Sequence, residues 1–347
     1  MKRIRIFTST QERVVLYLPL FFLFFVPIEL IFWGSLTSKL ANREITFLLN
    51  SVFLNVSHIY LTFLMLIRLP EFKSWIDSKY DGNSFVFWTK SFFVLMFIGM
   101  VSFLIPTMQQ NVYFAFFLVF FNTWGLQHGI FQTRGLSHCY NVKLKELCRS
   151  ENQKIAFLKS EKLEKLAFNL LYFSILLFNL IGYFNGIQLF NDLVVTVMKY
   201  ISTLGVAAYV CLLVAAVKTL PYANKSNKGL FLTRTIAYPL GLFSFFATFA
   251  SVTSHAVDYF CVFEKMNRNS AQAPSFKKSN FRLGLICLFT IGSLFALTLY
   301  MPHLWISPAL GQCWFIFGFL HFYLDGVIFA MRHPAGRKFI APLLNTA

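Results

Sequence analysis

Apolar residues occur along this chain in nine long runs, separated by shorter polar and basic segments. Each run has about 20 residues or more, the length of helix that crosses the hydrocarbon core of a bilayer. The runs lack the polar–apolar alternation of membrane β-strands. The pattern predicts an all-α polytopic transmembrane bundle of eight or nine spans, at Val14–Leu36, Ile45–Ile67, Phe85–Ile105, Val112–Gln132, Leu166–Phe190, Leu193–Val217, Thr235–Phe263, Leu283–Trp305 and Ala309–Met331.

Two features interrupt this pattern. Pro19, Pro27 and Pro239 fall inside runs and predict kinks, because proline cannot donate a helical hydrogen bond. The segment 134–165 mixes leucine, isoleucine and phenylalanine with lysine and glutamate. It predicts an amphipathic cytoplasmic loop that lies as a helix on the membrane surface, although a solvated connector fits the same residues.

Composition and charge support a membrane protein. Of the 347 residues, 57% are hydrophobic and 45 are phenylalanine, more apolar surface than a soluble core buries. The net charge of +17 comes from lysine and arginine between the runs, which indicates topology and contact with anionic lipids and not nucleic-acid binding.

The basic segment Met1–Arg13 precedes a run without a small-residue cleavage site, so it predicts a retained first helix with a cytoplasmic N-terminus in a plasma (inner) membrane. Nine spans then place the basic loop Glu264–Arg282 on the outer side, against the positive-inside trend. The six cysteines are scattered and predict no disulfide framework.

Short matches suggest an internal repeat within the single integral-membrane domain 1–347. Val56-Ser57-His58 matches Thr253-Ser254-His255, and Gly125-Leu126-Gln127-His128 matches Gly318-Phe319-Leu320-His321. The histidines are 70 residues apart in the first pair and 66 in the second. We interpret this as half-repeats 14–133 and 193–332, inverted by an extra fifth span, although chance matches in a chain rich in Phe, Leu and Gly also produce such patterns.

Inverted repeats bring equivalent residues together near the bilayer midplane. We therefore expect His58, His128, His255 and His321 to form a quartet that binds a transition metal, since imidazole nitrogen suits iron, copper and zinc. The alternative for each histidine alone is an interhelical hydrogen bond.

The second half adds carboxylates that the first half lacks. Asp258 follows His255 by three residues and Asp325 follows His321 by four, so each shares a helical face with its histidine. We expect them in catalytic roles, as extra ligands or as acceptors that orient the rings. Pairing with lysine or arginine is the structural alternative. Glu29 inside the first span is a candidate for a proton path.

The segment Trp124-Gly125-Leu126-Gln127-His128-Gly129 resembles the Gly-x-x-His-Gly segment of membrane-embedded carotene dioxygenases of the bacteriorhodopsin-related Brp type. That resemblance is local and implies a non-haem iron held by histidines from several helices, with His128 as the matching residue. Gln132 stands near the position where the family has an aspartate, and the family's later, closely spaced histidines have no match.

Together these patterns predict an integral-membrane metal-dependent oxidoreductase, a non-haem iron oxygenase that acts on a lipid, an isoprenoid or another hydrophobic molecule and takes electrons from a donor. Motifs of hydrolases, P-loop proteins and di-iron membrane hydroxylases are missing. Two other classes use the same residues: a transporter that binds a metal ion or proton at the His/Asp cluster, and a haem protein with two axial histidines.

Overall fold

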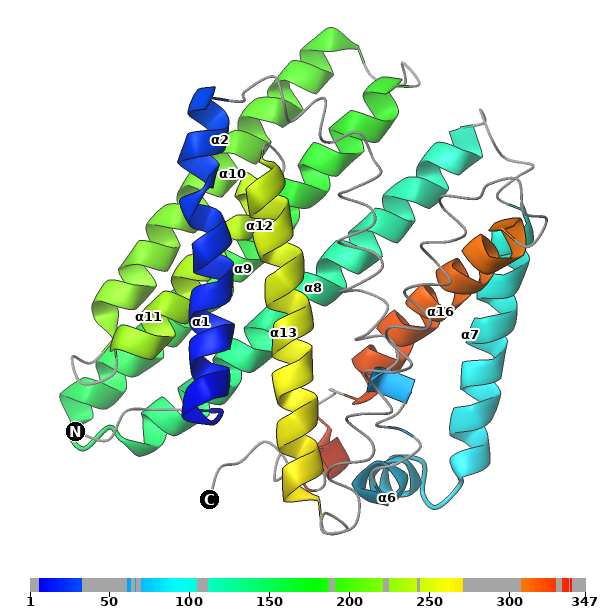
Figure 1. Cartoon of the computed structure of the whole chain (residues 1–347), viewed down its shortest axis with the longest axis horizontal. Helices are drawn as coiled ribbons and strands as arrows, with labels where there is room; N and C mark the ends of the chain where they lie inside the picture. Colours follow the sequence, from blue (N-terminus) through cyan, green and yellow to red (C-terminus); the bar gives the residue numbers. More distant parts are fainter. Residues whose placement is uncertain are drawn as a thin grey trace. The chain divides into compact units, whose positions relative to one another are not determined.

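A computed structural model describes residues 6–32, 61–63, 66, 70–104, 112–186, 191–220, 225–241, 244–270, 307–328, 333–336 and 338. Within these ranges the regular secondary structure is helical and contains no strands, which confirms the predicted all-α class (Figure 1). The predicted spans Ile45–Ile67 and Leu283–Trp305 fall mostly or wholly outside the described residues.

The chain divides into two compact units. Unit 1 comprises Met1–Thr37 and Met108–His255, and unit 2 comprises Ser38–Thr107 and Ala256–Ala347. The division falls inside one continuous helix, α13 (Phe245–Asn269). It does not follow the half-repeats 14–133 and 193–332, which stay a prediction.

The first predicted span is two helices, α1 (Ser9–Phe24) and α2 (Val26–Phe32). Thr8 begins α1 with a capping box, in which its hydroxyl accepts from the Gln11 backbone and the Gln11 side chain accepts from the Thr8 backbone. The helix is interrupted at Phe25, two residues before Pro27, whereas Pro19 lies inside α1. An interruption thus lies beside Pro27, where a kink was predicted, because Pro27 has no N–H to donate to the carbonyl four residues earlier and its ring crowds that carbonyl.

The predicted surface loop 134–165 is instead the continuation of two long helices. Helix α8 (Val112–Glu146) extends well past the predicted end at Gln132, and α9 (Glu151–Gly186) begins well before Leu166. Only residues 147–150 connect them, and the two helices pack together. The amphipathic composition reflects this packing: Leu144 and Phe157 are buried in a common cluster, while the lysines stay outside.

Helix α10 (Asp192–Thr219) packs closely against α9. Small and hydroxyl residues line the contact, as is usual between membrane helices. The Ser202 hydroxyl donates to the Ser174 carbonyl at 2.8 Å, and the Ser160 hydroxyl to the Ala216 carbonyl at 2.7 Å. At Gly205 the Ser174 side chain comes so close that an added Cβ would lie 2.1 Å from the Ser174 Oγ.

The short helix α11 (Lys225–Arg234) packs against α1, α8 and α10 through buried charged groups. The Lys228 ammonium lies 2.8 Å from the Glu164 carboxylate and donates to the Ser137 carbonyl at 3.0 Å. Arg234 donates to the Val15 carbonyl at 2.8 Å and covers the Phe231 ring. These contacts compensate for burying two cations.

Pro239 lies in α12 (Ala237–Leu240), a four-residue helix that is separate from α13. The predicted span Thr235–Phe263 is therefore not one helix. The Glu29 carboxylate on α2 accepts from the Ser244 hydroxyl at 2.5 Å and from the Phe246 backbone amide at 3.1 Å. An anion at this position complements the partial positive charge of the α13 N-terminus. Glu29 thus anchors α13, a simpler role than the proton path considered above.

In unit 2, α6 (Pro70–Lys79) leads to α7 (Ser84–Leu104) through a tight turn with left-handed backbone at Asp81 and Gly82. Helix α16 (Ser307–Ile328) packs against α7. The predicted spans Phe85–Ile105 and Ala309–Met331 correspond to these two helices.

Four helical segments within the described residues are long and apolar enough to cross a membrane: Ser9–Ile31, Ser84–Val101, Glu151–Ile181 and Asp192–Thr219. Ile316–Val327 is a shorter apolar helix. Helices α7 and α10 expose rows of large apolar side chains, including Phe85, Phe93, Leu193 and Leu204. Such faces are costly in water and favourable against lipid. The presence of nine membrane spans stays a prediction.

Candidate metal centre

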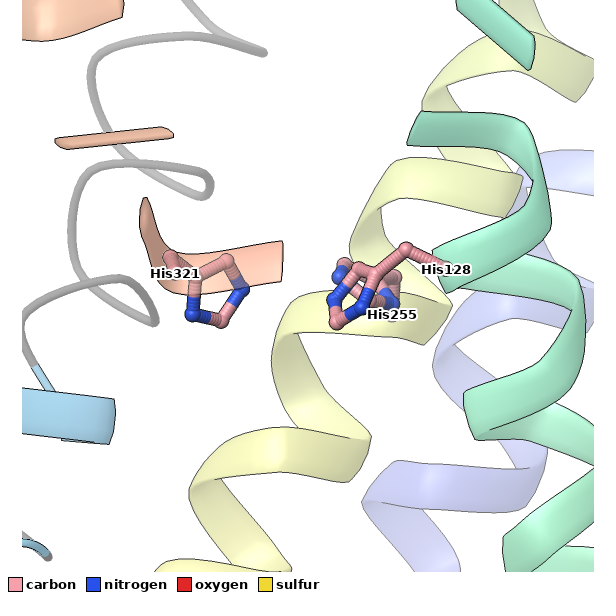
Figure 2. Close-up of side chains that lie close together, drawn as sticks. All are labelled: His128, His255 and His321. Atoms are coloured by element: carbon pink, nitrogen blue, oxygen red, sulfur yellow. The ribbon is translucent and has the colours of Figure 1, made fainter. Parts of the chain in front are cut away.

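The candidate metal ligands are His128, His255 and His321, one histidine each from α8, α13 and α16 (Figure 2). His128 is half-buried, while His255 and His321 are buried. Each histidine offers one ring nitrogen as a ligand atom. His128 and His255 belong to unit 1 and His321 to unit 2, so their surroundings are described separately.

In unit 1, the imidazole rings of His128 and His255 lie edge to face. Their centroids are 5.0 Å apart and their planes are inclined by 82° (Figure 2). The Gln132 side-chain amide, one turn after His128 on α8, donates to the His255 backbone carbonyl at 3.3 Å. This bond ties α8 to α13 beside the two rings.

The ring separation can be compared with metal coordination. With metal–nitrogen bonds of about 2.0–2.1 Å, two imidazoles on one ion have centroids roughly 5 Å apart at a near-tetrahedral angle and roughly 6 Å apart when trans. The observed 5.0 Å fits neighbouring positions on one ion. It also fits an edge-to-face contact of two rings without metal, so distance alone does not establish binding.

In unit 2, His321 belongs to a buried hydrogen-bonded cluster with Thr62, Tyr259 and Asp325. The Thr62 hydroxyl lies 2.7 Å from the His321 Nδ1 and donates to the Asp325 Oδ1 at 2.8 Å. The Tyr259 hydroxyl donates to the same Asp325 oxygen at 2.9 Å and contacts the Thr62 hydroxyl. All four side chains are almost inaccessible to solvent, His321 and Thr62 completely so.

Asp325 acts on His321 through Thr62. The Asp325 Oδ1 is 3.6 Å from the His321 Nδ1, longer than a hydrogen bond, while both atoms lie within 2.8 Å of the Thr62 hydroxyl. Metal-ligating histidines commonly have such a partner on the ring nitrogen that does not bind metal. A metal bond from His321 would then use Nε2.

The other predicted site residues have different outcomes. Asp258 is buried on α13, three residues after His255, and its catalytic role stays a prediction. His58, the fourth member of the quartet, lies outside the described residues. His138, also on α8, is exposed and lies 3.5 Å from the Glu161 carboxylate.

Thr62 and Tyr259 were not predicted from the sequence, although the sequence contains a signal for them. Each quartet histidine is followed four residues later by a polar or hydroxyl side chain: Thr62 after His58, Gln132 after His128, Tyr259 after His255 and Asp325 after His321. Residues four apart share a helical face. Of these four residues only Asp325 is a carboxylate, and so only Asp325 was predicted as a partner of its histidine.

No protein-family model matches the chain, and comparisons with curated proteins and with solved structures also found no match.

Proposed function

We propose that this chain is an integral-membrane metalloprotein in which His128, His255 and His321 bind one transition-metal ion. The observation on which the proposal depends is the His128–His255 pair, whose rings are separated as two imidazoles on one ion are. Buried histidines at membrane depth are costly and usually functional. His58 is the proposed fourth ligand.

His321 is added to the pair as a proposed ligand because the match between Gly125–His128 and Gly318–His321 makes it the counterpart of His128 in the predicted repeat.

We further propose that the metal is non-haem iron and that the protein is an oxidoreductase for a lipid, isoprenoid or other hydrophobic molecule. Three neutral imidazoles suit iron as well as copper and zinc. A bound iron supplies oxygen activation and electron transfer. The local likeness of Gly125–Gly129 to carotene dioxygenases supports iron, and the apolar outer faces of α7 and α10 suit a substrate that is dissolved in the bilayer.

The separation of His128 and His255 argues against haem between them. Two axial ligands are trans, with centroids roughly 6 Å apart and the porphyrin between them. At 5.0 Å the rings contact each other directly.

Metal analysis tests the proposal. Protein purified in detergent, as isolated and after loading with Fe(II) under anaerobic conditions, should contain about one metal ion per chain. His128→Ala, His255→Ala and His321→Ala should each lose most of it because each removes a ligand. His138→Ala is the matched control, since this exposed histidine on α8 should not affect the metal content. The site would be rejected if the wild type contained no metal after loading, or if the three variants contained as much metal as the wild type.

Two further measurements separate the classes of function. A Soret band in the visible spectrum would assign the histidines to haem. Iron-loaded protein with membrane lipid extract should consume oxygen in a lipid-dependent manner, and His255→Ala should not. If oxygen consumption is absent and the ion crosses vesicle membranes with the protein present, the site belongs to a transporter.

A further inference from the structure

The cluster around His321 contains more hydrogen-bonding groups than a single histidine–carboxylate pair would need. Thr62, Tyr259 and Asp325 come from three separate segments of unit 2 and are hydrogen-bonded to one another, and Thr62 also contacts the His321 Nδ1. Their role can be derived by following each proton through the cluster.

Two hydroxyl groups donate to the same oxygen. Thr62 donates to the Asp325 Oδ1 at 2.8 Å and Tyr259 donates to it at 2.9 Å. A carboxylate oxygen that accepts two hydrogen bonds from hydroxyl groups acts only as an acceptor. Because a threonine hydroxyl has one proton, Thr62 has none left for His321.

The imidazole ring must then be the donor in the 2.7 Å hydrogen bond between His321 and Thr62. The His321 Nδ1 must carry hydrogen and donate to the Thr62 oxygen, which has lone pairs to accept it. A neutral imidazole with hydrogen on Nδ1 has its lone pair on Nε2. The geometry points to Thr62 as the positioning residue that fixes His321 in the Nδ1–H tautomer and so selects Nε2 as its ligand atom.

Tyr259 and Asp325 have supporting roles in this assignment. Asp325 accepts the Thr62 proton and so orients the hydroxyl, and Tyr259 fixes the acceptor oxygen from α13. The tautomer follows from contacts inside unit 2 alone. Its consequence for metal affinity rests on the proposed metal site.

The tautomer can be measured without metal. In metal-free protein labelled with ¹⁵N-histidine, solid-state NMR separates protonated from unprotonated ring nitrogens, and the spectrum of His321→Gln identifies the His321 signals. We expect hydrogen on Nδ1 in the wild type and in Thr62→Ser, which keeps the hydroxyl. Thr62→Val should lose this preference. Thr133→Val, a buried threonine on α8 that contacts Tyr238, is the matched control and should leave the His321 signals unchanged.

Hydrogen on Nε2 of His321 in the wild type would overturn the inference, as would an unchanged tautomer in Thr62→Val. A second readout is metal affinity by chelator competition, which should weaken by about 10- to 100-fold in Thr62→Val and recover in Thr62→Ser. If the tautomer is as expected but the wild type binds no metal, the inference about Thr62 holds and the proposed function fails.

Discussion

Replacing one partner of the buried Lys228–Glu164 ion pair should destabilise the protein strongly. The two side chains are 1% and 4% exposed, and their charged atoms are 2.8 Å apart. Glu164→Gln leaves the Lys228 ammonium buried next to a neutral amide. Breaking a buried pair from one side costs about 3–5 kcal/mol. For 347 residues, with an unfolding entropy of about 2.1 cal/mol/K per residue, that corresponds to a loss of roughly 4 to 7 °C in Tm.

The loss should depend on pH. Burial lowers the pKa of Lys228 below its usual value, and the Glu164 carboxylate offsets only part of this lowering. Without Glu164 the pKa of Lys228 should fall further. Between this depressed pKa and the usual value near 10.4, the folded protein binds fewer protons than the unfolded chain, so stability rises with pH in that window. Glu164→Gln should regain stability as the pH is raised toward 10, more than the wild type does.

Thermal unfolding in detergent, followed by circular dichroism at several pH values, measures both effects. Replacing both partners, with Glu164→Leu and Lys228→Met, should recover much of the loss because no charge stays buried alone. Lys154→Met is the control, since its pair with Glu151 is exposed and contributes little. A Tm for Glu164→Gln close to the wild type, with no response to pH, would refute the reasoning.

Two other positions test contacts between helices of unit 1. Gly205→Ala would place a Cβ 2.1 Å from the Ser174 Oγ, so it should lower the free energy of unfolding by about 1–3 kcal/mol. Adding Ser174→Ala should restore most of that stability in thermal unfolding. Equal losses of stability in the single and double variants would contradict the proposed contact. Glu29→Ala removes the acceptor at the α13 N-terminus and should lower the Tm by more than Glu29→Gln, which keeps one acceptor oxygen. Equal Tm values for the two Glu29 variants would argue against this anchoring.

The histidines show how far pattern reasoning reaches. Matching short segments within apolar runs identified His128, His255 and His321 as candidates, because ionisable groups are rarely placed in such runs without a function. The edge-to-face contact of the His128 and His255 rings depends on how α8 and α13 pack, and on the bond between Gln132 and the His255 backbone. No periodicity within one helix contains that information.

The helix boundaries also differ in how far the local sequence predicts them. Apolar run length predicted α7 and α10 to within a few residues, since bilayer thickness determines the length of such a run. It did not predict that residues 134–165, which are mostly helical as expected, belong to the long helices α8 and α9. Amphipathic residues are compatible with a membrane surface or with a neighbouring helix, and only the tertiary packing distinguishes the two.

The sequence by itself therefore determined the helical class of this protein and the presence of helices long and apolar enough to cross a membrane, because hydrophobicity and length act locally along the chain. Tertiary structure decided which groups meet. Thr62 and Asp325 are 263 residues apart in sequence and share a hydrogen bond, and Glu29 anchors a helix that begins more than 200 residues later. Such contacts depend on side-chain packing between distant helices, which a single sequence does not specify position by position.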